Sequence, residues 1–366
     1  MAAPVIVGMS GGVDSAVAAL LLRDAGHEVQ GLFMSNWEED EDGYCTAARD
    51  FQDARSVCAE IGIPLHRVSF ASEYRDRVFA HFLAEYSRGR TPNPDVLCNR
   101  EIKFGVCFDY ARRLGAGRFA TGHYARTGPG VDGSTTLLRA RDRAKDQSYF
   151  LHAVGQAQLG LTLFPLGNLQ KAEVRRIARQ RGLPVFDKRD STGICFIGER
   201  PFARFLETYL PAQPGRIEDA QGGSLGEHRG LMFYTLGQRA GLGLGGRRGA
   251  AEAPWYVAAK DVARNVLVAV QGHDHPLLLS TGLATEPASW ICGKAPAVKF
   301  ACTAQFRYRQ RDVPCQVSVG PDGGTEVVFE SPQRAVTPGQ YAVFYRGDEC
   351  LGGAVISAAR AASQPL

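Results

Sequence analysis

The first half of the chain alternates short apolar runs with stretches whose apolar residues recur at the period of a helix. The apolar runs are PVIVGM, EVQGLFM, PLHRVSF and GRFATGHY, and helical patterns follow the first three over residues 16–24, 50–61 and 73–86. Repeated strand–helix units build parallel sheets that carry helices on both faces. The pattern therefore predicts an α/β domain with a doubly wound parallel sheet.

The composition and the hydrophobic pattern of the sequence change over residues 201–214. Beyond this stretch come the glycine-rich segments GGSLGE and GLGLGG and short β-branched runs such as NVLVAV and EVVFE. Short strands separated by glycine and proline are typical of all-β domains. We therefore expect a catalytic α/β domain over residues 1–202, a small β-rich domain over residues 203–278 and a C-terminal β-barrel over residues 279–362.

Composition and segment lengths narrow the class of protein. The 366 residues, 45% hydrophobic and 22% charged, are enough for two or three domains with ordinary cores. No apolar run is long enough to cross a membrane, and the N-terminus MAAPVIVGMSGG does not resemble a signal peptide. We expect a cytoplasmic protein without membrane contact. The nine cysteines, an odd number scattered along a large chain, argue against a secreted disulfide framework, and the absence of any CxxC pair argues against a structural zinc site.

Positive charge is concentrated in one part of the chain. The net charge is only +4, but residues 139–189 hold eleven Lys and Arg against four Asp and Glu. A local excess of positive charge of this kind is typical of surfaces that bind a phosphate backbone. A solvated helix face is the alternative explanation.

A glycine-rich loop lies between the first predicted strand and the first predicted helix. Its residues are Gly8, Met9, Ser10, Gly11, Gly12, Val13, Asp14 and Ser15. The glycines allow a close approach to a polyanion, and helix N-terminal amides with the Ser10 and Ser15 hydroxyls can bind phosphate oxygens. The lysine of a GxxxxGK[ST] loop is missing. The loop therefore predicts an anion cradle of another type.

Two cysteines lie in segments whose composition suits a reactive thiol. Cys98 lies in TPNPDVLCNR and Cys195 in DSTGICFIGE, each beside turn-forming and charged residues rather than in an apolar run. A thiol of low pKa that is accessible to substrate needs such surroundings. The other seven cysteines are interpreted as small buried hydrophobes.

These segments together carry a family resemblance. SGGVDS resembles the PP-loop of the ATP pyrophosphatases, and with GLFMSNWEED, NPDVLCNREIKFG, ATGHYAR, KDQSYFL, DSTGICFIGERPF, GLMFYTLGQRAGLGLGG, RYRQ and TPGQYAVFY the chain resembles the bacterial tRNA-specific 2-thiouridylases. The resemblance implies a PP-loop, adenine nucleotide alpha hydrolase-like fold. It also implies ATP-dependent 2-thiolation of the tRNA wobble uridine, U34, by adenylation of O2 and sulfur transfer from a cysteine persulfide, with AMP and pyrophosphate as products.

The resemblance also assigns roles to residues. Nucleotide contacts fall on the loop from Gly8 to Ser15, on Met34 and on Gly122, with Asp14 holding Mg²⁺ on the pyrophosphate. Cys98 becomes the nucleophile and Cys195 the persulfide carrier. The base-binding turn is Asn93, Pro94 and Asp95, and the remaining tRNA contacts are His123, Lys145, Asp146, Gln147, Arg307, Tyr308 and Gln340.

Chemistry supports several of these roles. A flipped uridine needs polar partners on its edge, which Asn93 and Asp95 can supply from a proline-rigidified turn. The tract Arg307-Tyr308-Arg309 joins guanidinium groups that bind phosphate to a ring on which a base can stack. For His123 a structural role is the alternative.

The expected partners are ATP, Mg²⁺, tRNAs of the Lys, Glu and Gln acceptors, and a sulfur-relay protein or cysteine desulfurase as the sulfur donor. Three alternatives stay open. The chain could be a PP-loop enzyme that amidates its substrate, or a nucleic-acid-binding module without catalysis. Asp95, Cys98 and Cys195 could also ligate a [4Fe-4S] cluster whose fourth iron binds sulfide.

Overall fold

The N-terminal domain is built on a five-stranded parallel sheet of strand order β3-β2-β1-β4-β7. The computed structural model describes residues 3–37, 47–190, 202–244 and 253–362. The prediction of a parallel α/β sheet is confirmed, and each of the four apolar runs forms one of its strands. The strands are β1 (Val5–Met9), β2 (Val29–Ser35), β3 (Leu65–Ser69), β4 (Arg118–Thr121) and β7 (Thr162–Leu163).

Helices cover both faces of this sheet because its central strand is apolar on both sides. Val5, Val7 and Met9 of β1 pack in one core with α1 (Val13–Asp24), α2 (Ala47–Ile61) and α9 (Lys171–Gln180). Ile6 points the other way, into a core with Phe104 and Phe119. This second face is covered by a long helical segment that includes α6 (Cys107–Arg113).

The helical material between β3 and β4 contains two wide, π-type stretches. The predicted helix over residues 73–86 is α3 (Ala71–Tyr74), η1 (Arg75–Phe79) and α4 (Ala80–Ser87). The second stretch is η2 (Cys98–Val106), which continues α5 (Pro94–Leu97). The backbone leaves the helical region at Gly105 (φ −100°, ψ −110°), so η2 is kinked there, and it begins at a residue expected to be catalytic.

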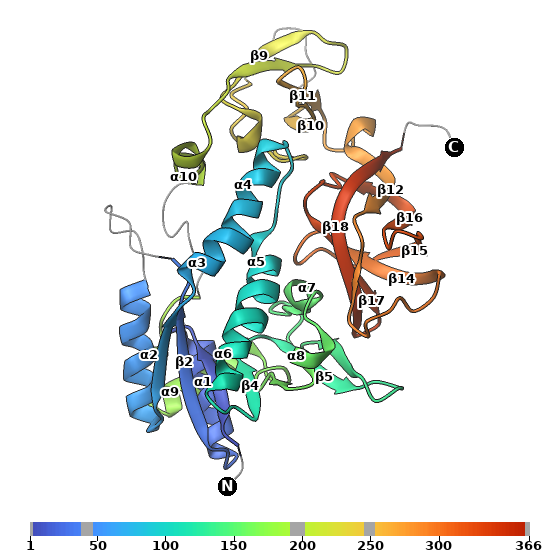
Figure 1. Cartoon of the computed structure of the whole chain (residues 1–366). Coiled ribbons are helices and arrows are strands. Elements are labelled where there is room, and N and C mark those ends of the chain that lie inside the picture. Colours follow the sequence, from blue (N-terminus) through green and yellow to red (C-terminus); the bar gives the residue numbers. More distant parts are fainter. Residues whose placement is uncertain (1–2, 38–46, 191–201, 245–252, 363–366) are drawn as a thin grey trace.

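The middle of the chain forms a small sheet of order β10-β11-β8-β9, in which β8 and β11 are parallel. Ile217, Val257 and Leu267 lie in its core. Figure 1 shows this sheet at the end of the molecule opposite the parallel sheet. Its elements are α10 (Phe202–Tyr209), β8 (Gly215–Glu218), β9 (Ser224–His228), η3 (Leu231–Phe233), β10 (Trp255–Asp261), β11 (Val266–Gln271) and η4 (Pro276–Leu278).

The C-terminal strands close into an antiparallel barrel, as predicted. Closure follows because β12 pairs with both β16 and β18. Val317, Phe344 and Ile356 lie in the barrel core. The strands are β12 (Leu279–Thr285), β13 (Ser289–Trp290), β14 (Lys299–Gln305), β15 (Val313–Val319), β16 (Thr325–Arg334), β17 (Tyr341–Arg346) and β18 (Glu349–Ala361).

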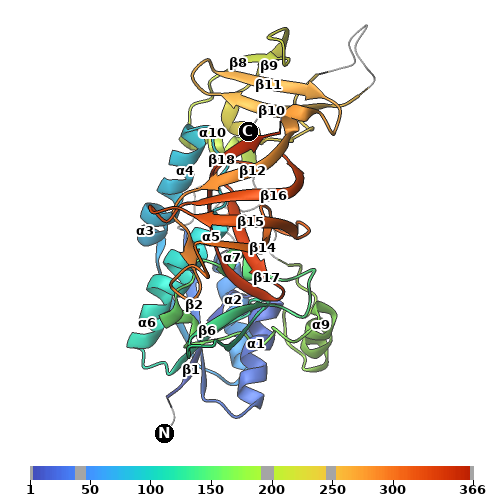
Figure 2. The ribbon, with the colours of Figure 1, turned by 90° about the vertical axis from the view of Figure 1, so that its right-hand side faces the viewer.

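A hairpin of the first domain extends the sheet of the barrel. It consists of β5 (Ala125–Pro129) and β6 (Thr135–Arg139), and β6 pairs with β18 through Leu137 and Cys350. Figure 2 shows β6 below the barrel strands, at its border with the first domain. The sequence patterns predicted no such link. The hairpin places residues 139–147, α7 (Ser148–Leu151) and α8 (Gln156–Leu159) next to the barrel.

None of the helices in the described part of the chain is both long enough and apolar enough to cross a membrane.

Candidate active site and nucleic-acid surface

The loop after β1 folds tightly onto the start of α1. The Ser10 amide donates to Ser15 Oγ at 3.2 Å, and Ser15 Oγ donates to the Gly12 carbonyl at 3.1 Å. Gly11 has φ +72°, and a Cβ there would lie 2.2 Å from the Asp50 carbonyl oxygen, so only glycine fits. Gly12 occupies the N-cap position of α1 and has no side chain that could cap the amides that open the helix. The loop therefore offers backbone N–H groups and hydroxyls to an anion.

Gly122 closes the same edge of the sheet from the end of β4. A Cβ at Gly122 would lie 2.7 Å from the Ser15 amide nitrogen and 2.8 Å from the Asp14 carbonyl carbon. Met34 stands near the end of β2, which pairs with β1. The structure thus brings the predicted nucleotide residues together at the carboxyl ends of β1, β2 and β4, where doubly wound sheets bind ligands.

The carboxylate of Asp14 is held by residues far along the chain. Tyr124 donates its hydroxyl to Asp14 at 2.8 Å, and Lys171 Nζ lies 2.8 Å from both carboxylate oxygens. Lys171 also pairs with Asp190 at 2.8 Å, and Asp190 pairs with Lys145 at 2.7 Å. Burial alone would raise the pKa of Asp190, but hydrogen bonds from the two lysines lower it to about 2. A chain of alternating charge therefore joins the loop to Lys145.

A second lysine reaches the same loop from the other side. Lys188 Nζ donates to the Gly11 carbonyl at 3.0 Å and pairs with Asp50 at 2.7 Å and with Asp53. The loop lacks a lysine of its own, yet the fold places two beside it. The motif gave no sign of either, because both lysines come from the basic tract of residues 139–189.

The turn expected to bind the base starts a helix. Asn93 Oδ1 accepts a hydrogen bond from the Asp95 amide at 3.2 Å, and Pro94 occupies the first helical turn. Asp95 is exposed, yet the protein around it partly desolvates the carboxyl, which raises its pKa. The nearby positive charge of Lys103 lowers the pKa but does not outweigh the desolvation. The turn is thus preformed, with its acidic group turned outward.

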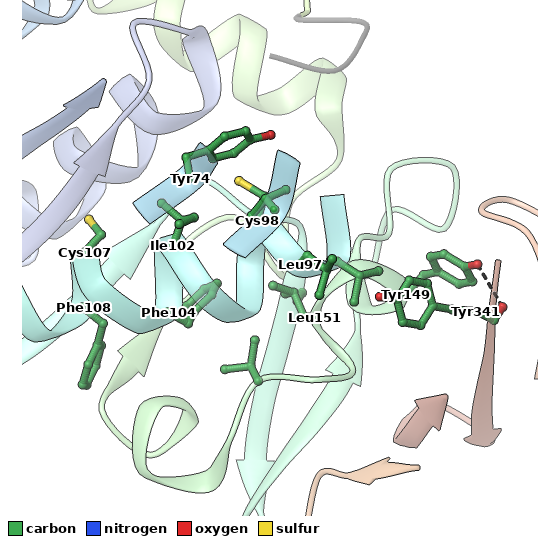
Figure 3. Packing of buried hydrophobic residues seen from close by; sticks show 14 of the residues in the cluster. Tyr74, Leu97, Cys98, Ile102, Phe104, Cys107, Phe108, Tyr149, Leu151 and Tyr341 are labelled. Carbon is green, nitrogen blue, oxygen red and sulfur yellow. Dashed lines mark hydrogen bonds between the residues drawn. The ribbon is translucent and has the colours of Figure 1, made fainter. Parts of the chain in front are cut away.

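The Cys98 thiol does not have the exposure that its sequence context predicted. Cys98 is 5% exposed and belongs to a buried cluster with Tyr74, Ile102 and Phe104 (Figure 3). The expectation of an accessible thiol is wrong for this conformation, because the helical turn from Asp95 carries position 98 to the inner face. Cys195 lies outside the described residues, so the pairing of the two cysteines stays a prediction.

The buried cluster around Cys98 extends from the nucleotide edge to the barrel. The Phe104 ring centroid lies 5.8 Å from that of His123, the residue after Gly122. Desolvation and the charge of Lys103 lower the pKa of His123 well below its usual value, so its imidazole is neutral. At the other end of the cluster, Tyr149 donates its hydroxyl to the Tyr341 carbonyl of the barrel at 3.0 Å (Figure 3).

Three of the predicted tRNA residues line a basic pocket of about 790 Å³ between residues 139–146 and the loop from β14 to β15. These are Lys145, Asp146 and Tyr308, joined by Arg139, Arg143, Arg309 and Arg311. Arg139 and Arg143 belong to the basic tract of residues 139–189, whereas nothing in the sequence indicated a role for Arg311. Cations outnumber carboxylates in this lining, which also includes Asp312. The arrangement suits a polyanion.

The other predicted tRNA residues have structural partners. Arg307 Nη2 donates to the carbonyls of Leu236 and Ala335, each at 3.0 Å. Gln340 Nε2 donates to the Thr91 carbonyl at 2.8 Å. The Gln147 side chain accepts from the Tyr124 amide at 2.9 Å. Asp146 of the pocket is also buried and accepts from the Ala140 amide at 2.8 Å. These side chains shape the surface, and their contact with tRNA stays a prediction.

Three family profiles match: the tRNA methyl transferase HUP domain over residues 3–199, the tRNA methyl transferase PRC-barrel domain over residues 203–271 and the aminomethyltransferase beta-barrel domain over residues 280–356. The "tRNA-specific 2-thiouridylase MnmA" of Marinobacter nauticus is 60% identical over 96% of this chain and 90% of its own length. That of Chromohalobacter salexigens is 59% identical over 100% of this chain and 95% of its own. The chain belongs to the tRNA-specific 2-thiouridylase family.

A metal centre in this 2-thiouridylase family member remains a prediction. Within the described residues, no group of three or more His, Cys, Asp or Glu side chains is placed to hold a metal ion. The set considered for a [4Fe-4S] cluster, Asp95, Cys98 and Cys195, includes one residue outside that part. A U34-tRNA thiolase NcsA from Methanococcus maripaludis, solved with its [4Fe-4S] cluster, is 19% identical over 53% of this chain and 62% of its own. Its TM-score of 0.36 carries no weight for a cluster here.

Proposed function

We propose that this protein catalyses ATP-dependent 2-thiolation of the wobble uridine of tRNA. One observation carries the proposal: the helix that begins at Cys98 packs through Phe104 against His123, and the adjacent Gly122 touches the start of the nucleotide loop. The helix thus carries Cys98 between the turn that would hold the base and the contact with the nucleotide edge at Phe104. The relatives named as 2-thiouridylases match nearly the whole chain, which supports the same reaction.

In the first half of the reaction the uridine O2 attacks the α-phosphorus of ATP, and pyrophosphate leaves. The amides at the start of α1 and the hydroxyls of Ser10 and Ser15 would bind the phosphates. Asp14 would hold Mg²⁺, which neutralises charge on the leaving pyrophosphate. Tyr124 and Lys171 hold the Asp14 carboxylate in place until the ion arrives.

In the second half the terminal sulfur of a persulfide on Cys195 adds to C2, and AMP leaves with the original oxygen. The Cys98 thiolate attacks the inner sulfur, so that the carrier sulfur stays on the base and the two cysteines end as a disulfide. A disulfide needs Cα atoms within about 7 Å. Because the Cys98 thiol is buried in this conformation, the step requires it to leave its apolar cluster when the base enters.

The basic pocket supports tRNA as the macromolecular substrate. Its arginines and Lys145 come from two domains, so a phosphate backbone seated there would touch both. The Tyr308 ring centroid lies 4.4 Å from that of Phe150, on the segment that follows Lys145. tRNAs with Lys, Glu and Gln acceptors are the proposed substrates, and a sulfur-relay protein or cysteine desulfurase is the proposed donor.

The test is ATP-dependent transfer of labelled sulfur from persulfidated enzyme into a tRNA transcript, followed by nucleoside analysis. We expect labelled 2-thiouridine with the natural protein, and none with Cys98→Ser or Cys195→Ser. Both variants should still release pyrophosphate when tRNA is added. Pyrophosphate release with incorporation of ammonia and no labelled sulfur would point to the amidating enzyme. Binding of tRNA without pyrophosphate release would point to the non-catalytic module.

A further inference from the structure

Two thiols face each other across the hairpin that carries the loop of the basic pocket. Cys302 on β14 is directly opposite Cys315 on β15, and their sulfur atoms lie 3.7 Å apart. Directly opposite residues of antiparallel strands have Cα atoms about 4.5–5.5 Å apart. A disulfide needs a Cα separation of about 4.4–6.8 Å. The backbone is thus already placed for a bond, and only the two sulfurs must close.

The surroundings of the pair give the two sulfurs different roles. Cys315 is 2% exposed and lies on the inner face of β15 with Val313 and Val317, whereas Cys302 is only half-buried. A small oxidant therefore reaches Cys302 first. The hydrogen bond with Cys302, together with burial, raises the pKa of Cys315. Cys315 therefore keeps its proton.

We propose that Cys302 and Cys315 form a reversible oxidation site whose oxidant is a hydroperoxide. The Cys302 thiolate attacks the peroxide oxygen, the O–O bond breaks, and Cys302 becomes a sulfenic acid while an alcohol or water leaves. The Cys315 sulfur then attacks the Cys302 sulfur, the S–O bond breaks, and the oxygen leaves as water with the Cys315 proton. The two thiols lose two electrons in total, and the peroxide gains them.

The position of the pair couples this chemistry to the pocket. The residues between β14 and β15 include Tyr308, Arg309 and Arg311, which line the basic pocket. Arg309 already holds a left-handed backbone conformation, φ +63°. A bond between Cys302 and Cys315 would fix the base of this loop. A disulfide is also apolar enough for the barrel core, whereas a sulfinate at Cys302 would place charge beside it.

The site is separate from the proposed sulfur-transfer cysteines and goes beyond the proposed function. It is therefore tested in the full chain with Cys98→Ser and Cys195→Ser, which removes their disulfide. Hydrogen peroxide is added, thiols are alkylated, and peptides are analysed without reduction. We expect a cross-linked peptide pair containing Cys302 and Cys315, loss of both alkylation adducts, and recovery of both after dithiothreitol.

Cys292 is the matched control thiol, because it has the same intermediate exposure and its sulfur lies 3.8 Å from the Ser134 hydroxyl rather than from a thiol. It should oxidise without an internal cross-link. Cys302→Val keeps an apolar side chain in the barrel and should leave Cys315 fully alkylated after peroxide. Alkylation of both Cys302 and Cys315 at a peroxide dose that oxidises Cys292 would overturn the proposal. So would a sulfinate at Cys302 without a cross-link.

Discussion

Lys171 is the residue whose replacement tests the proposed nucleotide site most directly. Its side chain is 12% exposed and lies between Asp14 and Asp190, with Nζ 2.8 Å from each. Lys171→Met keeps most of the aliphatic volume and removes the ammonium group. Asp14 then keeps the Tyr124 hydroxyl, whereas Asp190 keeps its ion pairs with Lys145 and Arg175. The change therefore falls mainly on Asp14.

The expected loss of stability is moderate. Removing one partner of a fully buried ion pair costs about 3–5 kcal/mol. The Asp14 and Asp190 side chains are 30% and 29% exposed, so water can solvate the carboxylates that lose Lys171. We therefore expect about 1–2 kcal/mol less free energy of unfolding. The functional loss should be larger, because a residue that orients a metal-binding carboxylate is typically worth about 10–100-fold in activity or metal affinity.

The assay is pyrophosphate release with ATP and tRNA over a series of Mg²⁺ concentrations, beside thermal unfolding of each variant. Arg175→Met is the matched control, since Arg175 Nη2 binds Asp190 at 2.7 Å and makes no contact with Asp14 among the described residues. We expect Lys171→Met to lower the rate and change its Mg²⁺ dependence, and Arg175→Met to change neither strongly. Equal Mg²⁺ curves for Lys171→Met and the natural protein would refute the idea that Lys171 positions Asp14 for the ion.

Three further predictions test the rest of the site. Gly122→Ala places a methyl group 2.7 Å from the Ser15 amide nitrogen. This substitution should lower the free energy of unfolding by about 1–3 kcal/mol and raise the KM for ATP. An unchanged KM would contradict the inference that Gly122 packs against the nucleotide loop. Arg309→Ala should make the salt dependence of tRNA binding shallower by about 0.9 in the log–log slope, and an unchanged slope would mean that Arg309 meets no phosphate. Burial lowers the pKa of Lys260 to about 8, below the unfolded value of about 10.4. Between pH values of about 8 and 10.4 the unfolded state therefore binds more protons than the folded state. The free energy of unfolding, relative to that of Lys260→Met, should rise with pH across this window. Urea unfolding of both proteins measures this difference, and a difference that does not change with pH would contradict the lowered pKa of Lys260.

Local sequence patterns predicted the elements that local forces determine. The apolar runs became strands because a parallel sheet covered on both faces needs apolar residues on both sides, as in β1. The loop from Gly8 to Ser15 was recognisable because glycine at position 11 is dictated by its own φ and by the nearby Asp50 backbone. In each case the residue types record the cause directly: apolar side chains mark a strand that is buried on both faces, and glycine marks a left-handed backbone position with no room for a side chain.

The features that the sequence did not predict depend on contacts between distant segments. The pairing of β6 with β18 joins Leu137 to Cys350, and neither segment carries a sign of the other. Lys171 reaches Asp14 only after the sheet and α9 are in place. Cys98 is buried because its helix turns it away from Asp95 into a cluster assembled from several elements, so charges nearby in sequence were a poor guide to exposure.

The segment before the turn of residues 93–95 is held by both β domains. The Thr91 amide donates to the Pro338 carbonyl of the barrel at 3.1 Å, and Arg90 pairs with Glu286 at 2.8 Å. Lys260 of the middle domain donates to the Gly89 carbonyl at 3.0 Å. Since α5 and Cys98 follow this segment directly, a displacement of either β domain would move the start of the helix that carries Cys98. If tRNA binds on the barrel as proposed, we therefore expect its binding to change the exposure of the Cys98 thiol, which alkylation of Cys98 with and without tRNA would measure.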